Sequence, residues 1–238
     1  MQATDTAQNL TENSPFDFAC KDDLPCFTQC CKDVNIYLTP YDVLRLRQTL
    51  GISSSGFLEK YARSFLSKVG NIPVVQLLMD PQTLYCPFVS EEGCQVYEDR
   101  PWACRMFPLD LASTTEAKFR IIAGKERCKG LFERSKGTVK DWLQSQGVLE
   151  YSQMDREFQS VVPDSFKPGA PMNEGLGRVL FMAYDLDRFA ELLEDSRFLN
   201  FHEIDDETLS LAGKDMKELL RLAFRYIRSQ LDELYQLV

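Results

Sequence analysis

The pattern of apolar and polar positions divides the chain into an irregular first half and a helical second half. After Gly137, apolar side chains recur at intervals of three and four residues, which is the period of an amphipathic helix. A cluster of prolines and glycines predicts a loop over residues 163–177. The periodicity predicts four helices, over residues 138–143, 151–162, 185–198 and 214–237.

The first half predicts shorter elements. Thr39 followed by Pro40 is typical of a helix start, and Gly51 is placed to end that helix. A second helix is expected after Ser53–Ser55, with apolar positions from Phe57 to Leu66. Residues 1–15 are polar, and we expect them to be frayed. We also expect strands over residues 74–79 and 119–122, a short strand over 95–97, and a helix start over 99–102 that carries Cys104.

Charge and composition narrow the classes of function. The formal net charge is −9, which argues against non-specific nucleic-acid binding, because such binding needs a basic face. No segment approaches the roughly 20 apolar residues that span a bilayer, and the first residues lack a signal peptide's features. We therefore expect a cytoplasmic location, no nucleic-acid partner and no membrane insertion. A protein partner remains open.

The cysteines are the strongest chemical signal. In a reducing compartment, clustered cysteines indicate metal binding or redox chemistry more than disulfides or scattered buried thiols. The adjacent pair Cys30–Cys31 points to opposite sides of an extended backbone, which favours ligation of different metal atoms or clusters. We expect all eight cysteines to be metal ligands: Cys20, Cys26, Cys30, Cys31, Cys86, Cys94, Cys104 and Cys128.

The predicted helices and strands indicate an α+β, mostly helical fold class. Because the cysteines all lie in the first half, we expect a small cysteine-rich metal-binding core with short strands, followed by a helical C-terminal extension. We expect a flexible N-terminus (residues 1–15), a cysteine-cluster metal-binding domain (residues 16–135) and a helical extension packed on it (residues 136–238).

The choice of metal rests on spacing. Zinc sites usually present C-x₂₋₄-C pairs, and only the separation of Cys26 from the adjacent pair Cys30–Cys31 fits that spacing. Iron–sulfur clusters tolerate irregular spacing, and the step Cys86-Pro87 is similar to ferredoxin ligands. We favour an iron–sulfur cluster of the 4Fe–4S type and keep zinc as the alternative. Basic residues beside the cysteines would offset thiolate charge, or would be ordinary surface charges: Lys32, Arg100, Arg105, Arg127 and Lys129.

Catalytic signals are weak. The single histidine, His202, has no second histidine to complete a zinc-hydrolase pattern, and we interpret it as a surface or packing residue. Gly175-Leu-Gly177 is too short for a dinucleotide fingerprint. The run Asp205-Asp206-Glu207 is typical of a helix cap. The catalytic residues are therefore unknown, and whether the chain is an enzyme stays open.

Several short motifs occur together in a fixed order along the first half of the chain. They are Phe18-Ala-Cys20, Cys26, Gln29-Cys30-Cys31, Ile36-Tyr-Leu-Thr39-Pro-Tyr-Asp42, Cys86-Pro-Phe, Gly93-Cys94-Gln-Val-Tyr97 and Asp99-Arg-Pro-Trp-Ala-Cys104-Arg-Met-Phe-Pro108. On these motifs the chain resembles the CxxCxxCC, or YkgJ-like, cysteine-cluster proteins, which are described as zinc- or iron-chelating domains. The resemblance covers residues 16–135 and implies that the eight cysteines form a metal centre. The gap between Cys20 and Cys26 is wider than usual for the family.

Three hypotheses follow. The first is a metal-binding protein with a structural, electron-transfer or accessory role. The second is a metal-cluster enzyme, because one branch of the family is similar to the flagellin lysine N-methylase. The third is a thiol redox sensor that uses Cys26 and Cys30, which requires those thiols to be free.

Overall fold

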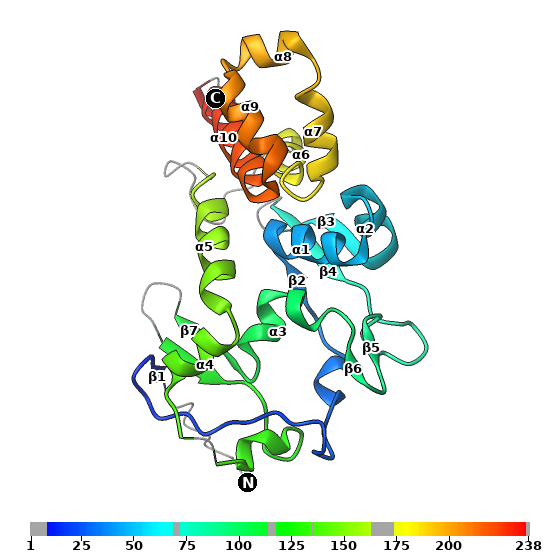
Figure 1. Ribbon diagram of the computed structural model, residues 1–238, viewed down its shortest axis with the longest axis vertical. Helices are drawn as coiled ribbons and strands as arrows, with labels where there is room; N and C mark the ends of the chain where they lie inside the picture. The colour runs from blue at the N-terminus through cyan, green and yellow to red at the C-terminus, as the bar shows by residue number, and fades with distance from the viewer. Residues whose placement is uncertain (1–8, 69–71, 114–117, 135, 163–173, 237–238) are drawn as a thin grey trace. The chain divides into compact units, whose positions relative to one another are not determined.

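The computed structural model describes residues 9–68, 72–113, 118–134, 136–162 and 174–236 (Figure 1). These residues pack into two compact units. Unit 1 comprises Met1–Ile36 and Met79–Glu150, and unit 2 comprises Tyr37–Leu78 and Tyr151–Val238. The described residues form ten α-helices and small sheets of short strands, which confirms the α+β, mostly helical fold class. Within this part of the chain, no helix combines the length and the apolar character needed to cross a membrane.

The compact units combine early and late parts of the chain. Residues 37–78, within the predicted cysteine domain, belong to unit 2, and residues 136–150, within the predicted extension, belong to unit 1. The expected boundary at residue 135 follows the distribution of cysteines, whereas the units follow the packing of strands and helices. The docking of a helical extension on the cysteine domain stays a prediction.

Unit 1 is built from short elements around a small apolar core. The 3₁₀ helices are η1 (Gln29–Cys31), η2 (Tyr97–Asp99) and η3 (Lys129–Phe132), and the α-helices are α3 (Trp102–Met106), α4 (Val139–Ser145) and the start of α5 (Val148–Gln159). One antiparallel sheet has the order β1 (Leu10–Thr11), β8 (Lys118–Ile121), β7 (Leu109–Ser113), and a second pairs β5 (Val89–Ser90) with β6 (Gly93–Cys94). The core residues are Phe16, Phe18, Met106, Leu109, Phe119, Cys128, Val139, Leu143 and Val148.

The expectation of a frayed N-terminus is wrong for residues 9–15. Leu10 pairs with Phe119 in the sheet, and Pro15 forms a β-bridge with Thr138. The half-buried side chain of Leu10 packs against the core of unit 1, and this burial offsets the entropy of ordering the segment. Residues 1–8 lie outside the described part of the chain.

Unit 2 joins a small sheet to a set of helices. The antiparallel sheet has the order β2 (Tyr37–Leu38), β4 (Pro73–Leu77), β3 (Ala62–Leu66). The helices bury several large side chains completely, including Leu46, Phe57, Phe189, Leu220 and Ile227. They are α1 (Pro40–Leu50), α2 (Ser54–Tyr61), most of α5, α6 (Glu174–Phe181), α7 (Leu186–Leu192), α8 (Ser196–Phe201), α9 (Asp206–Lys214) and α10 (Met216–Gln236).

Helix starts were predicted well where a capping residue marks them. The Thr39 side chain accepts a hydrogen bond from the backbone N–H of Asp42, and the Asp42 carboxylate accepts one from the Thr39 N–H. Thr138 and Asp141 form the same reciprocal pair at α4. Gly51 ends α1 with a φ of 64°. These three predictions are confirmed.

Several other element predictions are wrong. Residues 62–66, expected to continue the second helix, form β3, because their side chains pair across the sheet with β4. Residues 95–97 are not a strand; the strand is Gly93–Cys94, and Tyr97 starts η2. Residues 185–198 form two helices rather than one, because Asp195 caps a new helix. The predicted loop ends at α6, which begins at Glu174; residues 163–173 lie outside the described part of the chain.

Candidate metal centre

All eight cysteines are described, and all of them belong to unit 1. They come from separate pieces of backbone: the loop that ends in η1, the residues around the β5–β6 hairpin, helix α3 and the residue that precedes η3. None forms a disulfide. Cys20 is exposed, Cys128 is buried, and the other six are half-buried. The structure therefore contains eight reduced thiols in one unit, and a disulfide scaffold is not observed.

Backbone hydrogen bonds tie the cysteine-bearing segments to one another. The N–H of Cys86 donates to the carbonyl of Cys31 at 2.8 Å, beside a β-bridge between Lys32 and Tyr85. The N–H of Ala19 donates to the carbonyl of Gly130 at 3.3 Å. The segment 19–32 thus contacts both the residues before the hairpin and the residues that follow Cys128.

Two glycines allow the close approach of these segments. A Cβ on Gly130 would lie 2.6 Å from the carbonyl oxygen of Ala19, so any side chain there would push the two segments apart. Gly93 has a φ of 115°, and a Cβ there would lie 3.1 Å from the ring of Phe27. Sequence reasoning named Gly93 only as part of a family motif and did not single out Gly130. The sequence signal that could have identified them is their position, one residue before Cys94 for Gly93 and two residues after Cys128 for Gly130.

Cys30 and Cys31 lie in the 3₁₀ helix η1 and not in extended backbone, so the expectation that they point to opposite sides is wrong. The Sγ atoms of Cys30 and Cys31 lie 3.9 Å apart and share a hydrogen bond. This hydrogen bond, supported by the positive charge of Arg127, lowers the pKa of the Cys30 thiol to about 7. The same hydrogen bond, followed by burial, raises the pKa of Cys31.

The charge of Cys30 contributes to the raised pKa values of several other cysteines, and these cysteines fall into two groups. Burial, with smaller contributions from Cys30, Cys128 and Cys26, raises the pKa of Cys20 to about 11. Burial likewise raises the pKa of Cys86 to about 11, with smaller contributions from Cys94 and Cys30. After the hydrogen bond and burial, Cys104 and Cys86 contribute to the raised pKa of Cys31. One group contains Cys20, Cys26 and Cys128, and the other contains Cys31, Cys86, Cys94 and Cys104.

The thiols do not form a preassembled metal cage. Among the described residues, no three cysteine, histidine, aspartate or glutamate side chains come together in an arrangement that could hold a metal ion. The assignment of all eight cysteines as ligands therefore stays a prediction. Neighbouring thiolates repel one another, so without a cation to neutralise them a close arrangement of sulfurs is unfavourable.

Two buried arginines lie next to the cysteine segments. Arg100 and Arg105 are each 7% exposed. The guanidinium of Arg100 donates to the Tyr97 carbonyl and to Oε1 of Gln146, both at 2.5 Å, and it forms no ion pair within the described residues. Arg105 donates to the carbonyls of Gln146, at 2.7 Å, and of Glu98. Gln146 thus holds both arginines, and nothing in the sequence pattern identified it.

The charge of Arg100 acts on the thiols. Burial raises the pKa of the Cys94 thiol, and the positive charge of Arg100 opposes that rise. Arg100 opposes the rise at Cys20 in the same way. A buried cation with neutral hydrogen-bond acceptors is stabilised by negative charge nearby, and thiolates would supply it. Arg127 lowers the pKa of Cys30 in the same sense, so two of the basic residues singled out from the sequence, Arg100 and Arg127, favour thiolate forms.

The other candidate residues have ordinary structural roles. The ring of His202 lies between aromatic rings, 4.5 Å from that of Phe198 and 5.0 Å from that of Tyr226, as expected for a packing residue. Asp205 caps α9 by accepting a hydrogen bond from the N–H of Thr208. The Cys26 sulfur accepts a hydrogen bond from the N–H of Lys129 at 3.2 Å, whereas the Cys30 sulfur shares a hydrogen bond with that of Cys31. No observation favours Cys26 and Cys30 as a redox pair.

Comparison with known proteins gives one match. Residues 19–134 match the model of the CxxCxxCC family, described as "Putative zinc- or iron-chelating domain". The matched segment contains all eight cysteines. No curated protein and no solved structure matches the chain.

Proposed function

We propose that the chain holds an iron–sulfur centre through its eight cysteines, a proposal that starts from the match of residues 19–134 to the CxxCxxCC family model of zinc- or iron-chelating domains. The role we propose is structural or electron-transferring. The family match supports metal binding in general. The cluster type, the ligand set and the role are our proposal.

The observation that carries the proposal is the gathering of eight reduced thiols in unit 1. Thiolates are soft ligands that select zinc, Cu(I) or iron–sulfur clusters over magnesium or calcium. The thiols come from loops and from the ends of short elements, which can adjust around a bound centre more easily than long helices can. Half-burial shields the thiols from water while leaving them accessible to an incoming metal.

The two groups of thiols favour more than one centre. Zinc takes four ligands, as does each iron–sulfur cluster of the common types. We propose that Cys20, Cys26 and Cys128 act with Cys30 at one centre, and that Cys31, Cys86, Cys94 and Cys104 form the other. This division separates the adjacent cysteines Cys30 and Cys31, which have individually perturbed pKa values.

The preference for iron–sulfur over zinc rests on ligand spacing. The short separation of a zinc knuckle occurs only between Cys26 and the adjacent pair Cys30–Cys31, and the proposed groups draw ligands from distant parts of the sequence. A cluster is larger than a single ion and bridges such ligands more readily. Each four-thiolate centre would carry net negative charge, and Arg100, buried among neutral acceptors, is placed to offset it.

The test is anaerobic purification followed by measurement of iron, acid-labile sulfide and zinc. We expect iron and sulfide together, with broad absorption near ~400 nm, as thiolate-ligated clusters show. Cys31→Ser and Cys128→Ser each remove one ligand from a different group, so each should lower the metal content by about half, and the double variant should lose nearly all of it.

The matched control is Ala103→Ser, which introduces a serine beside Cys104 and keeps every thiol. It should keep the full metal content. Colourless protein with stoichiometric zinc would overturn the choice of metal, and protein with no metal would overturn the function. Full metal content in the double variant would remove Cys31 and Cys128 from the ligand set.

A further inference from the structure

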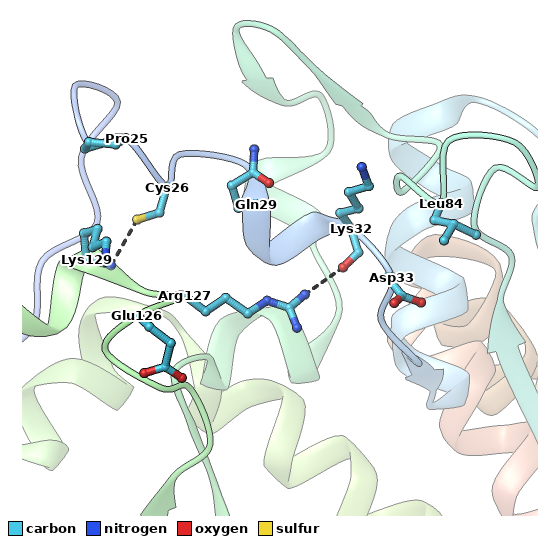
Figure 2. A pocket seen from close by; sticks show the side chains of 9 residues that line it. All are labelled: Pro25, Cys26, Gln29, Lys32, Asp33, Leu84, Glu126, Arg127 and Lys129. Carbon is cyan, nitrogen blue, oxygen red and sulfur yellow. Dashed lines mark hydrogen bonds between the residues drawn. The ribbon is translucent and has the colours of Figure 1, made fainter.

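Unit 1 contains a pocket of about 480 Å³ whose wall includes the sulfur-bearing side chain of Cys26 (Figure 2). This volume lies in the range of small-molecule sites. The wall comes from three separate parts of unit 1: the loop that runs through η1, the turn that contains Leu84, and the residues around Cys128. The lining residues are Pro25, Cys26, Gln29, Lys32, Asp33, Leu84, Glu126, Arg127 and Lys129.

Three cationic side chains line this pocket, in a chain with a net charge of −9. Within the described residues, Lys32, Arg127 and Lys129 form no ion pair with a carboxylate. One guanidinium N–H of Arg127 donates a hydrogen bond to the carbonyl of Lys32, at 2.8 Å, and the other N–H donors of Arg127 are available to a ligand. The Lys32 ammonium lies 4.9 Å from the centroid of the Tyr85 ring, and a cation–π contact leaves its hydrogen-bond donors available.

The acidic residues of the wall do not cancel these charges. The Glu126 carboxylate folds back over Gly124 and occupies the space where a side chain on that glycine would lie. Figure 2 shows Glu126 and Arg127 extending in different directions from neighbouring positions. This leaves Asp33 as the other carboxylate in the wall. The wall therefore carries an excess of positive charge.

The backbone around the pocket adopts unfavourable conformations. Thr28, Asp33 and Leu84 have φ values of 63°, 53° and 62°, in the left-handed region that non-glycine residues rarely occupy. The Asp33 N–H donates to the Leu84 carbonyl at 2.8 Å, which holds two of these residues together. Such strain is concentrated at functional sites, where surrounding structure maintains it.

We propose that this pocket binds a small molecule through an oxyanion group, a phosphate or a carboxylate, held by Arg127 and Lys32 beside the Cys26 thiol. A guanidinium offers parallel N–H donors that match two oxygens of such a group, and the ammonium adds a point charge. The location of this ligand next to a metal centre rests on the proposed function, whereas its attraction to the cations does not.

The test is calorimetric titration of the full chain, purified anaerobically with its metal, with pyrophosphate in one arm and citrate in the other. Saturable binding in either arm is expected, and the arm with the tighter binding identifies the oxyanion. Lys32→Gln and Arg127→Gln should each weaken binding about tenfold, because each removes a charge-assisted hydrogen bond. Sodium chloride at matched ionic strength measures general screening.

The control variant is Arg120→Gln, which removes a half-exposed cation of unit 1 that does not line the pocket. It should bind as tightly as the unmodified chain. Metal content is measured for every variant before titration, so weakened binding with metal retained reports on the pocket alone. Binding that is equal in all variants, absent in both arms or reproduced by sodium chloride would overturn the proposal. Protein without metal would refute the proposed function while leaving the anion titration readable.

Discussion

The two units differ in what fills their interiors. Unit 2 buries large apolar side chains completely, among them Leu46 in α1, Phe57 in α2 and Leu220 in the 21-residue helix α10. The cysteine-bearing part of unit 1 is made of strands of two residues, 3₁₀ turns and a five-residue helix, and it buries the cations of Arg100 and Arg105. Apolar burial explains the stability of unit 2, whereas such short elements need additional cross-links.

Metal removal should produce the largest difference in stability between the two units. Because the binding energy of a structural site is folding energy, a chelator should remove amide-exchange protection from the segments that carry Cys31, Cys86 and Cys128. The buried core of α10 contains no cysteine and should keep its protection. Hydrogen exchange followed by mass spectrometry measures both. Equal protection in unit 1 with and without metal would show that its loops are stable without the metal.

A cavity created in the apolar core of unit 2 should give the next largest change, a decrease in the free energy of unfolding. Leu220 is fully buried, so Leu220→Ala should lower the free energy of unfolding by about 2–5 kcal/mol. Leu211→Ala, at a half-exposed position of unit 2, should cost less than about 1 kcal/mol. Urea denaturation followed by circular dichroism gives both values. Since every cysteine lies in unit 1, metal content should stay unchanged, and its loss would contradict the separation of roles.

The smallest expected change in stability comes from removing the same capping motif in each unit. Thr39→Ala in unit 2 and Thr138→Ala in unit 1 each remove an N-cap hydroxyl and should each cost about 1 kcal/mol at neutral pH. A much larger loss for Thr138→Ala would show that α4 supports the cysteine-bearing segments as well as its own start. Denaturation with metal bound, measured by circular dichroism, distinguishes the two outcomes.

The capping box of unit 1 also predicts a pH dependence. The hydrogen bonds from Thr138 lower the pKa of Asp141. A carboxylate with a depressed folded-state pKa contributes stability above its unfolded pKa of about 3.9 and loses that contribution as pH falls through the folded value. The cost of Thr138→Ala should therefore diminish in acid. A cost that is constant from neutral pH to acid would mean that the hydrogen bond from the Thr138 hydroxyl to the Asp141 carboxylate adds no stability.

The sequence determined the features that depend on local chemistry. Thr39 and Thr138 are recognisable caps because the hydroxyl bonds a backbone N–H within the same turn. The apolar periodicity after residue 214 predicted α10, because one face of a long helix must be buried wherever it packs. The cysteines identified the chemistry of the site in the same way, since thiolates are soft ligands that select zinc, Cu(I) or iron–sulfur clusters wherever they meet.

Tertiary structure decided what depends on distant partners. Residues 62–66 carry a helical pattern but form β3, because β4 offers a complete ladder of hydrogen bonds. The joining of residues 37–78 with the late helices, and of residues 136–150 with the cysteine segments, follows from packing that no local pattern records. Likewise, Gln146 meets Arg100 and Gly130 meets Ala19 only after folding, because contacts between distant residues depend on the path of the whole chain.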